Sequence, residues 1–200
     1  MTQRLVWNFE FSTKKKFLKE DLDNHEKENL KWEKRAFWSH EEIIILNAVN
    51  PDLLNLTQYE QKNKEDAYYL LPDLDCNIKL RRNELLYKPL VKKTKKLLGF
   101  AAKINLSEHR DNPELLALQQ DALTKAHIVQ VKKEAFVYKF PNTPGIKLEL
   151  ARLEINQKIY FTACVEGRSL KGVETLSQHL LGKYVSCDYV SFLKKISDHD

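Results

Sequence analysis

The feature that most constrains the fold is a long β-patterned region between residues 128 and 166. Three strand patterns lie in it: Ile128–Phe140, Ile146–Ile155 and Lys158–Glu166. They are separated by a Pro141–Gly145 turn and by the pair Asn156–Gln157. Connections this short join antiparallel neighbours, because a parallel crossover needs about a dozen residues or more. The region is therefore predicted to be an antiparallel meander.

Further strand and helix patterns lie on both sides of the meander. Strands are expected at Leu5–Ser12, Leu30–Trp38, Ile43–Asn47, Asp66–Leu71, Asn77–Arg82 and Glu84–Pro89. Helices are expected at Pro113–His127, Leu170–Leu181 and Asp188–Ile196, with residues 13–29 weakly helical and Pro51–Asn63 a polar connection. Strands and helices do not alternate regularly, which disfavours a parallel sheet. The predicted fold class is α+β, an antiparallel β-barrel of about eight strands with several flanking helices, in one domain of residues 1–200.

The composition disfavours several classes of function. The 33 Lys and Arg residues exceed the 28 Asp and Glu residues by a net charge of +5, which is too mild for a nucleic-acid binder. The five Gly form neither a dinucleotide-binding nor a P-loop pattern. The three Cys, at 76, 164 and 187, have no spacing typical of zinc sites or disulfide frameworks. No apolar run approaches the roughly 18 residues that span a bilayer, so we expect a cytoplasmic protein without a membrane partner.

Charged residues inside the predicted strands are the unusual feature of this chain. Pairs that share a strand face are Lys79 with Arg81, Lys133 with Lys139, and Arg152 with Glu154. In an open sandwich these would form the solvent-facing half of the alternation. In a closed barrel they would point inward, and burying so many like charges requires an anion that neutralises them. The barrel alternative therefore predicts a polyanion, such as a phosphate chain, with carboxylates holding a divalent cation that bridges its oxygens.

The segment 78–88, Ile-Lys-Leu-Arg-Arg-Asn-Glu-Leu-Leu-Tyr-Lys, resembles the basic hairpin of the CYTH superfamily. These are the triphosphate tunnel enzymes, which include class IV adenylate cyclases, thiamine triphosphatases and inorganic triphosphatases. In them two basic residues at i and i+2 precede a short turn, and a Lys follows on the return strand. Later segments resemble the family in the same order: Val131–Phe136, Leu148–Ile155 with Tyr160–Glu166, and Cys187–Leu193.

The resemblance implies a set of site residues inside a tunnel. The phosphate-binding residues would be Lys79, Arg81, Lys88, Lys133 and Arg152, and the metal ligands for Mg²⁺ or Mn²⁺ would be Glu10, Glu166 and Glu154. Glu149 and Asn8 are alternative ligands. The chain departs from the family signature Glu-x-Glu-x-Lys, because Asn8 and Ser12 flank Glu10. It also departs in the closing strand, where Cys164 stands in place of a carboxylate.

Three functional readings follow from these observations. The first is binding, with metal-dependent hydrolysis, of a triphosphate-containing small molecule or inorganic polyphosphate. The second is a binding module of the same fold without turnover, and the third is an unrelated β-rich interaction protein. Metal dependence separates the first two, because phosphoryl transfer by this chemistry needs a divalent cation. The third predicts that the charges on the strands face solvent.

Overall fold

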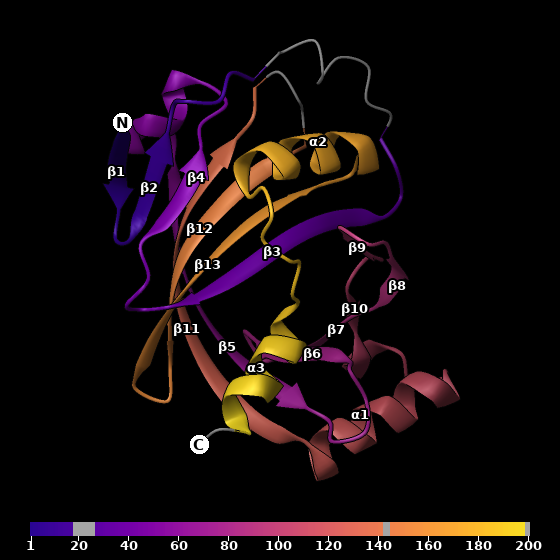
Figure 1. Ribbon diagram of the computed structural model, residues 1–200. Helices are drawn as coiled ribbons and strands as arrows, with labels where there is room; N and C mark the ends of the chain where they lie inside the picture. The colour runs from indigo at the N-terminus through magenta and orange to yellow at the C-terminus, as the bar shows by residue number, and fades with distance from the viewer. Residues whose placement is uncertain (18–26, 142–144, 199–200) are drawn as a thin grey trace.

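The computed structural model describes residues 1–17, 27–141 and 145–198 (Figure 1). Most of the strands belong to a ten-stranded antiparallel sheet. Its order is β10 (Ile104–Asn105), β7 (Glu84–Lys88), β6 (Asn77–Arg81), β5 (Glu60–Leu70), β11 (His127–Lys139), β12 (Lys147–Ile155), β13 (Lys158–Gly167), β3 (Lys31–Ser39), β9 (Leu98–Phe100) and β8 (Leu90–Lys93). The expected meander is β11, β12 and β13, so this prediction is confirmed.

The chain itself joins the two edges of this sheet. Only Pro89 separates β7, which lies next to the edge strand β10, from β8 at the other edge. On the return path Leu90 pairs with Phe100 in β9, and Tyr87 pairs with Ile104 in β10. The four short strands are thus the two arms of one bent hairpin, which pairs with β6 on one side and with β3 on the other. The sheet therefore curls into a tunnel, and closure of this kind protects strand edges.

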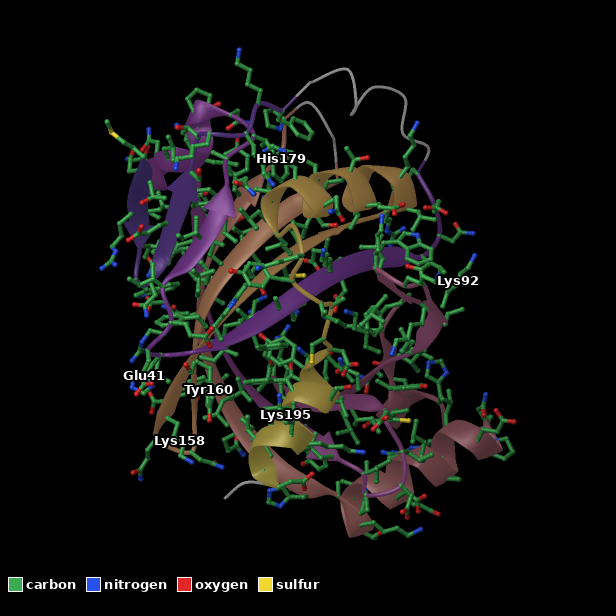
Figure 2. The ribbon with its side chains drawn as sticks, viewed as in Figure 1. Glu41, Lys92, Lys158, Tyr160, His179 and Lys195 are labelled. Atoms are coloured by element: carbon green, nitrogen blue, oxygen red, sulfur yellow. The ribbon has the colours of Figure 1, made fainter. Side chains whose placement is uncertain are left out.

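The bent hairpin contacts β3 through side chains as well as through the backbone pairing of β9 with β3. Lys92 of β8, labelled in Figure 2, places its ammonium nitrogen 6.0 Å from the ring centre of Trp32 in β3. Trp32 is buried and lies against Gly99 of β9, where a side chain would have no room. The close approach of β9 to β3 therefore requires glycine at this position.

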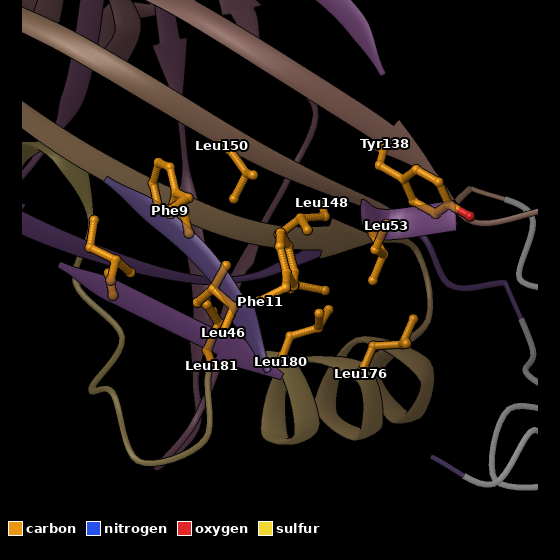
Figure 3. Packing of buried hydrophobic residues seen from close by; sticks show 14 of the residues in the cluster. Phe9, Phe11, Leu46, Leu53, Tyr138, Leu148, Leu150, Leu176, Leu180 and Leu181 are labelled. Atoms are coloured by element: carbon orange, nitrogen blue, oxygen red, sulfur yellow. The ribbon is translucent and has the colours of Figure 1, made fainter. Parts of the chain in front are cut away.

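A second, three-stranded sheet covers the outside of the tunnel. It consists of β1 (Thr2–Val6), β2 (Phe9–Ser12) and β4 (Ile44–Asn47). Phe9 and Phe11 point from β2 into a core shared with Leu148 of β12 and with α2 (Leu170–Leu180), as Figure 3 shows. Each contributes a fully buried ring, so burial of apolar surface holds this sheet on the tunnel wall.

The single strand expected at Leu5–Ser12 is wrong, because the segment folds as a hairpin of β1 and β2. Trp7 adopts a positive φ of 48° at the turn, and its ring packs against Phe136 and Phe161. Asn8 donates hydrogen bonds to the carbonyl groups of residues 40 and 42. These contacts reverse the chain after β1, which the alternation pattern alone did not indicate.

Two further helices complete the fold. α3 (Tyr189–Ser197) packs against the inner face of the tunnel wall, where Phe192 stacks on Phe37 with ring centres 4.0 Å apart. α1 (Pro113–Lys125) begins as expected, with the Asn112 side chain accepting hydrogen bonds from the first turn. It packs beside β6 and β7 in a third apolar cluster. The predicted α+β class with an antiparallel, tunnel-like sheet is confirmed, although this sheet has ten strands among the described residues where about eight were expected.

Other expectations have mixed outcomes. The polar connection expected over Pro51–Asn63 contains two short 3₁₀ helices, and β5 already begins at Glu60. Most of the weakly helical segment expected within 13–29 lies outside the described residues. Among the described residues, no helix is both long and apolar enough to cross a membrane.

Candidate functional site

The curled sheet holds a cavity of about 380 Å³ with a strongly positive lining. Ten basic side chains line it: Lys31, Arg35, Lys64, Lys79, Arg81, Lys88, Lys103, Lys133, Lys147 and Arg168. Three carboxylates join them: Glu33, Glu149 and Glu166. The surroundings therefore favour an anion strongly over a cation.

Strand alternation explains how charged side chains reach this cavity. Lys133 shares the inner face of β11 with Val131, and Glu149 shares the inner face of β12 with Ala151. Val131 and Ala151 belong to the apolar cluster under α3. Along β12 the inner face thus changes from charged to apolar, whereas Lys133 of β11 lies between Val131 and Ala135 of the apolar cluster. α3 covers this apolar part of the tunnel.

The carboxylates at the centre of the cavity each lie between cations. Lys133 donates hydrogen bonds of 2.9 and 3.1 Å to Glu149, and Arg35 donates one of 3.2 Å to the same group. Burial alone would raise the pKa of Glu149, but Lys133 and Arg35 hold that pKa well below its usual value. Glu149 is therefore ionised and orients two of the basic side chains.

A second buried carboxylate orients the predicted basic hairpin. Arg81 donates to both oxygens of Asp66, and Lys79 donates to one of them over 3.0 Å. Asp66 lies on β5 and is 5% exposed. One carboxylate thus fixes the direction of two cations from the neighbouring strand, which leaves a net positive charge at this wall.

Two more acidic groups lie farther from α3. Lys88 donates a 2.7 Å hydrogen bond to Glu33. Glu166 forms ion pairs of 2.9 Å with Lys31 and 2.8 Å with Lys147. Burial would raise the pKa of Glu166, but these two lysines keep it below the usual value.

The surplus of positive charge shows in the lysines. Burial, together with Arg81 and Lys103, lowers the pKa of Lys79 to about 7, although Asp66 opposes the shift. Burial and nearby Lys133 lower the pKa of Lys64 to about 8. Burial and cationic neighbours also lower the pKa of Lys103. Burial is the main reason that these three lysines hold their protons weakly, and the neighbouring cations add to it.

The structure brings together five of the eight phosphate- and metal-binding residues expected from the sequence. They are Lys79, Arg81, Lys88, Lys133 and Glu166, and the alternative ligand Glu149 lines the same cavity. These residues come from β6, β7, β11, β12 and β13, which include strands far apart along the chain. The basic hairpin pattern over 77–88 therefore pointed to side chains that share one cavity.

The other three are not brought to this cavity. Glu10 lies on β2 in the outer sheet, where it accepts hydrogen bonds from Thr2 and Arg4. Arg152 and Glu154 alternate with the inner-facing residues of β12 and line a shallow outer groove with Lys132 and Glu134. Among the strands in the N-terminal part of the chain, it is β3, and not β2, whose side chains face the cavity.

Several cavity residues were not singled out from the sequence. Lys31, Glu33 and Arg35 follow each other at i, i+2 and i+4 on β3, so their side chains share one face. That spacing could have identified the three residues from the sequence, in the same way as the i, i+2 spacing of Lys79 and Arg81. Asp66 had no comparable signal, because a single acidic residue at the start of an aromatic strand is common.

One cluster in the described part of the chain could hold a metal ion. The ligand atoms of Glu33, Cys164 and Glu166 lie within 4.8 Å of one another, and all three residues are buried. Burial raises the pKa of the Cys164 thiol far above its usual value, so the thiol is neutral. Mg²⁺ is commonly held by one or two carboxylates together with substrate phosphates. Glu33 and Glu166 could supply the carboxylates.

No protein-family model and no curated protein matches the sequence. Comparison of the structure with solved structures finds distant matches. A proposed adenylate cyclase from Bacillus halodurans is 9% identical, with 80% of this chain and 95% of that chain covered and a TM-score of 0.43. A proposed adenylyl cyclase from Hippeastrum, described as having a dominant triphosphatase activity, is 13% identical, with 84% and 96% covered and a TM-score of 0.47. The described strands of this chain themselves form the tunnel-like α+β sheet that the resemblance to the CYTH superfamily implied.

Proposed function

We propose that the cavity binds a phosphate chain, either the triphosphate of a small molecule or inorganic polyphosphate. The observation that carries this proposal is the imbalance of ten basic side chains against three lining carboxylates and the adjacent Asp66. Bringing so many like charges together is costly unless an anion neutralises them. The lowered pKa values of Lys79 and Lys64, which burial and neighbouring cations cause together, support this proposal.

The cavity suits a chain of phosphates better than a single phosphate. Its volume of about 380 Å³ lies within the range of small-molecule sites. The cations come from opposite walls: Arg81 from β6, Lys133 from β11 and Lys31 from β3. An extended polyanion could contact all three walls, with Arg81 offering paired donors and the lysines acting as point charges.

Metal-assisted hydrolysis of the same phosphate chain is the second candidate function. The observation that favours it is the proximity of Glu33 and Glu166 in the acidic cluster. A bound Mg²⁺ or Mn²⁺ would polarise phosphoryl oxygens and neutralise charge on them. Arg81, Lys133 and Lys88 would hold the phosphates and stabilise the charge that develops during transfer.

For this second function, the ion pairs of Glu33 and Glu166 affect when a divalent cation can bind relative to the phosphate chain. Lys88 holds Glu33, while Lys31 and Lys147 hold Glu166. A phosphate chain would draw these lysines away and free both carboxylates. The cation is therefore expected to bind together with the phosphate chain and weakly without it.

Thermal unfolding tests the primary proposal. Tripolyphosphate, with a chelator present, should raise the midpoint temperature in a concentration-dependent way, because a ligand of the native state stabilises it by mass action. Orthophosphate at equal ionic strength is the control and should raise it much less. Equal shifts with both anions would mean a nonspecific charge effect and would contradict the proposal. Release of phosphate from tripolyphosphate after addition of Mg²⁺ or Mn²⁺ would then establish the second function.

A further inference from the structure

The amine of Lys64 is not paired with a carboxylate, although it belongs to the cavity lining. Lys64 lies on β5 and is half-buried. Among the described residues, no hydrogen bond or ion pair engages its amine. Lys103 is also without an ion pair there, but it is exposed. The other lysines of the cavity each form an ion pair: Lys31, Lys79, Lys88, Lys133 and Lys147.

The surroundings of Lys64 favour the neutral amine. Burial is the main cause that lowers the pKa of Lys64 to about 8, from the ordinary lysine value of 10.5. Three cations add to this shift: Lys133, Arg81 and Lys147. Glu149 opposes it. Lys133 lies directly opposite Lys64 in the pairing of β5 with β11, where like charges repel. Near pH 8 about half of the amine is therefore neutral, whereas an ordinary lysine is almost fully protonated.

A neutral amine inside an anion site has a specific chemical use. Lysines activated by desolvation or by a neighbouring cation act as nucleophiles toward carbonyl carbons. The cations around Lys64 also attract anions and can stabilise an anionic leaving group. A reagent in which a carbonyl carbon is bonded to a phosphate group would benefit from both properties.

Acyl phosphates are the class of reagent that has this bond. Their phosphate group carries up to two negative charges. The ten basic side chains exceed the three lining carboxylates and Asp66 by more than that. Binding of one acyl phosphate therefore leaves the cavity positively charged, and the Lys64 amine remains activated.

We propose that Lys64 is a covalent modification site for acyl phosphates, which the cavity holds by their phosphate group while the acyl group is transferred to the Lys64 amine. This inference rests on the proposed function, because the same cations must bind phosphate. The amine attacks the carbonyl carbon and forms a C–N bond. The bond from that carbon to the phosphate oxygen breaks, and its electron pair leaves with the phosphate. The phosphate takes up the proton that the amine loses, so the products are an amide and inorganic phosphate.

The modification would regulate the cavity. The amide nitrogen carries no charge, so acylation removes one cation from the lining. The affinity for tripolyphosphate should then fall by up to about tenfold.

The test incubates the folded wild-type protein with acetyl phosphate at pH 8 and follows acetylation of each lysine by peptide mass spectrometry. Lys132 is the internal control, because it is exposed and lines the outer groove and not the cavity. Lys64 should be acetylated at least about tenfold faster than Lys132, because its pKa is lowered and the cavity concentrates the reagent. Tripolyphosphate should suppress the reaction at Lys64 and leave the rate at Lys132 unchanged.

A second acyl donor, p-nitrophenyl acetate, carries no phosphate and no charge. The preference for Lys64 over Lys132 should be at least about fivefold smaller with it than with acetyl phosphate. Equal preferences with the two donors would overturn the phosphate-directed transfer.

A calorimetric titration of tripolyphosphate into the same preparation separates this inference from the proposed function. Saturable binding, together with acetylation of Lys64 no faster than that of Lys132, would overturn the modification site and leave the proposed function standing. Absence of tripolyphosphate binding would overturn the proposed function, and the phosphate-directed transfer with it.

Discussion

Lys88 in β7 donates a 2.7 Å hydrogen bond to Glu33 in β3, across the join where the two edges of the curled sheet meet. Both side chains are largely buried. The pair links two features of the molecule, since the same lysine faces the cavity and the same glutamate belongs to the acidic cluster. A phosphate chain that binds Lys88 would release Glu33 to a divalent cation.

The first prediction concerns Glu33→Gln. Binding of tripolyphosphate without metal should be retained or tightened, because Lys88 loses its competing carboxylate. Any Mg²⁺-dependent release of phosphate should fall by about a hundredfold or more, as expected when a charged ligand of a catalytic cation is lost. Glu10→Gln on the outer sheet is the matched control and should change neither property. Calorimetry and a phosphate-release assay measure the two effects, and equal loss in both variants would contradict the role of Glu33.

The second prediction concerns Arg81→Ala. This change removes one guanidinium from the cavity wall and leaves Asp66 with Lys79 but without Arg81 as a partner. The affinity for tripolyphosphate should fall by about ten- to a hundredfold. Arg4→Ala removes the same charge and a similar pair with Glu10 at an exposed position, so its affinity should be nearly that of the wild type. Equal effects of the two changes would show that only net charge matters.

The third prediction concerns pH. The pKa values of Lys79, about 7, and Lys64, about 8, are below the ordinary lysine value of 10.5, which applies to the unfolded chain. Between pH 7 and pH 8 the unfolded state therefore binds more protons than the native state, so stability of the free protein should rise with pH. A bound phosphate chain raises both pKa values, and its affinity should fall over the same interval.

Unfolding midpoints at pH 7 and pH 8, with and without tripolyphosphate, measure these opposite trends. Lys79→Met removes the lysine whose pKa is displaced most among those with a stated value, so both slopes should become smaller in it. The prediction would be contradicted if the midpoint temperature of the free wild-type protein fell between pH 7 and pH 8 while that of Lys79→Met did not. Such a result would mean that protonated Lys79 stabilises the native state.

The fourth prediction concerns the join of the sheet. A methyl group at Gly99 would lie 2.8 Å from the Trp32 ring, which is 2% exposed and has little room to move. Gly99→Ala should therefore reduce the free energy of unfolding by about 1–3 kcal/mol. Denaturant unfolding measures the change, and a loss below about 0.5 kcal/mol would mean that β9 and β3 can separate without cost.

Local signals predicted much of the fold. The hairpin over 77–88 was recognisable because Arg82 and Asn83 separate two short strands, and both adopt positive φ as a two-residue turn requires. The meander was recognisable from its short connections for the same reason. The hairpin of β1 and β2 was missed because Trp7, at its turn, is an uncommon residue for positive φ.

The site was less predictable, because alternation shows which residues share a face but not which face is inside. β12 is buried on both faces: Ala151 packs beneath α3 while Leu150 packs toward the outer sheet. Its pattern therefore gave no reason to place Arg152 and Glu154 outside and Glu149 inside. That choice depends on the tertiary closure of the tunnel.

The most direct test of the central claim is a calorimetric titration of tripolyphosphate into the wild-type protein with a chelator present. Saturable heat with about one ligand per chain, weakened by salt as expected for charge-dominated binding, is the result that this account predicts. Titration at low salt without any binding heat, in a protein shown to be folded, would contradict it. The ten cations of the cavity would then have to serve a purpose other than holding a phosphate chain.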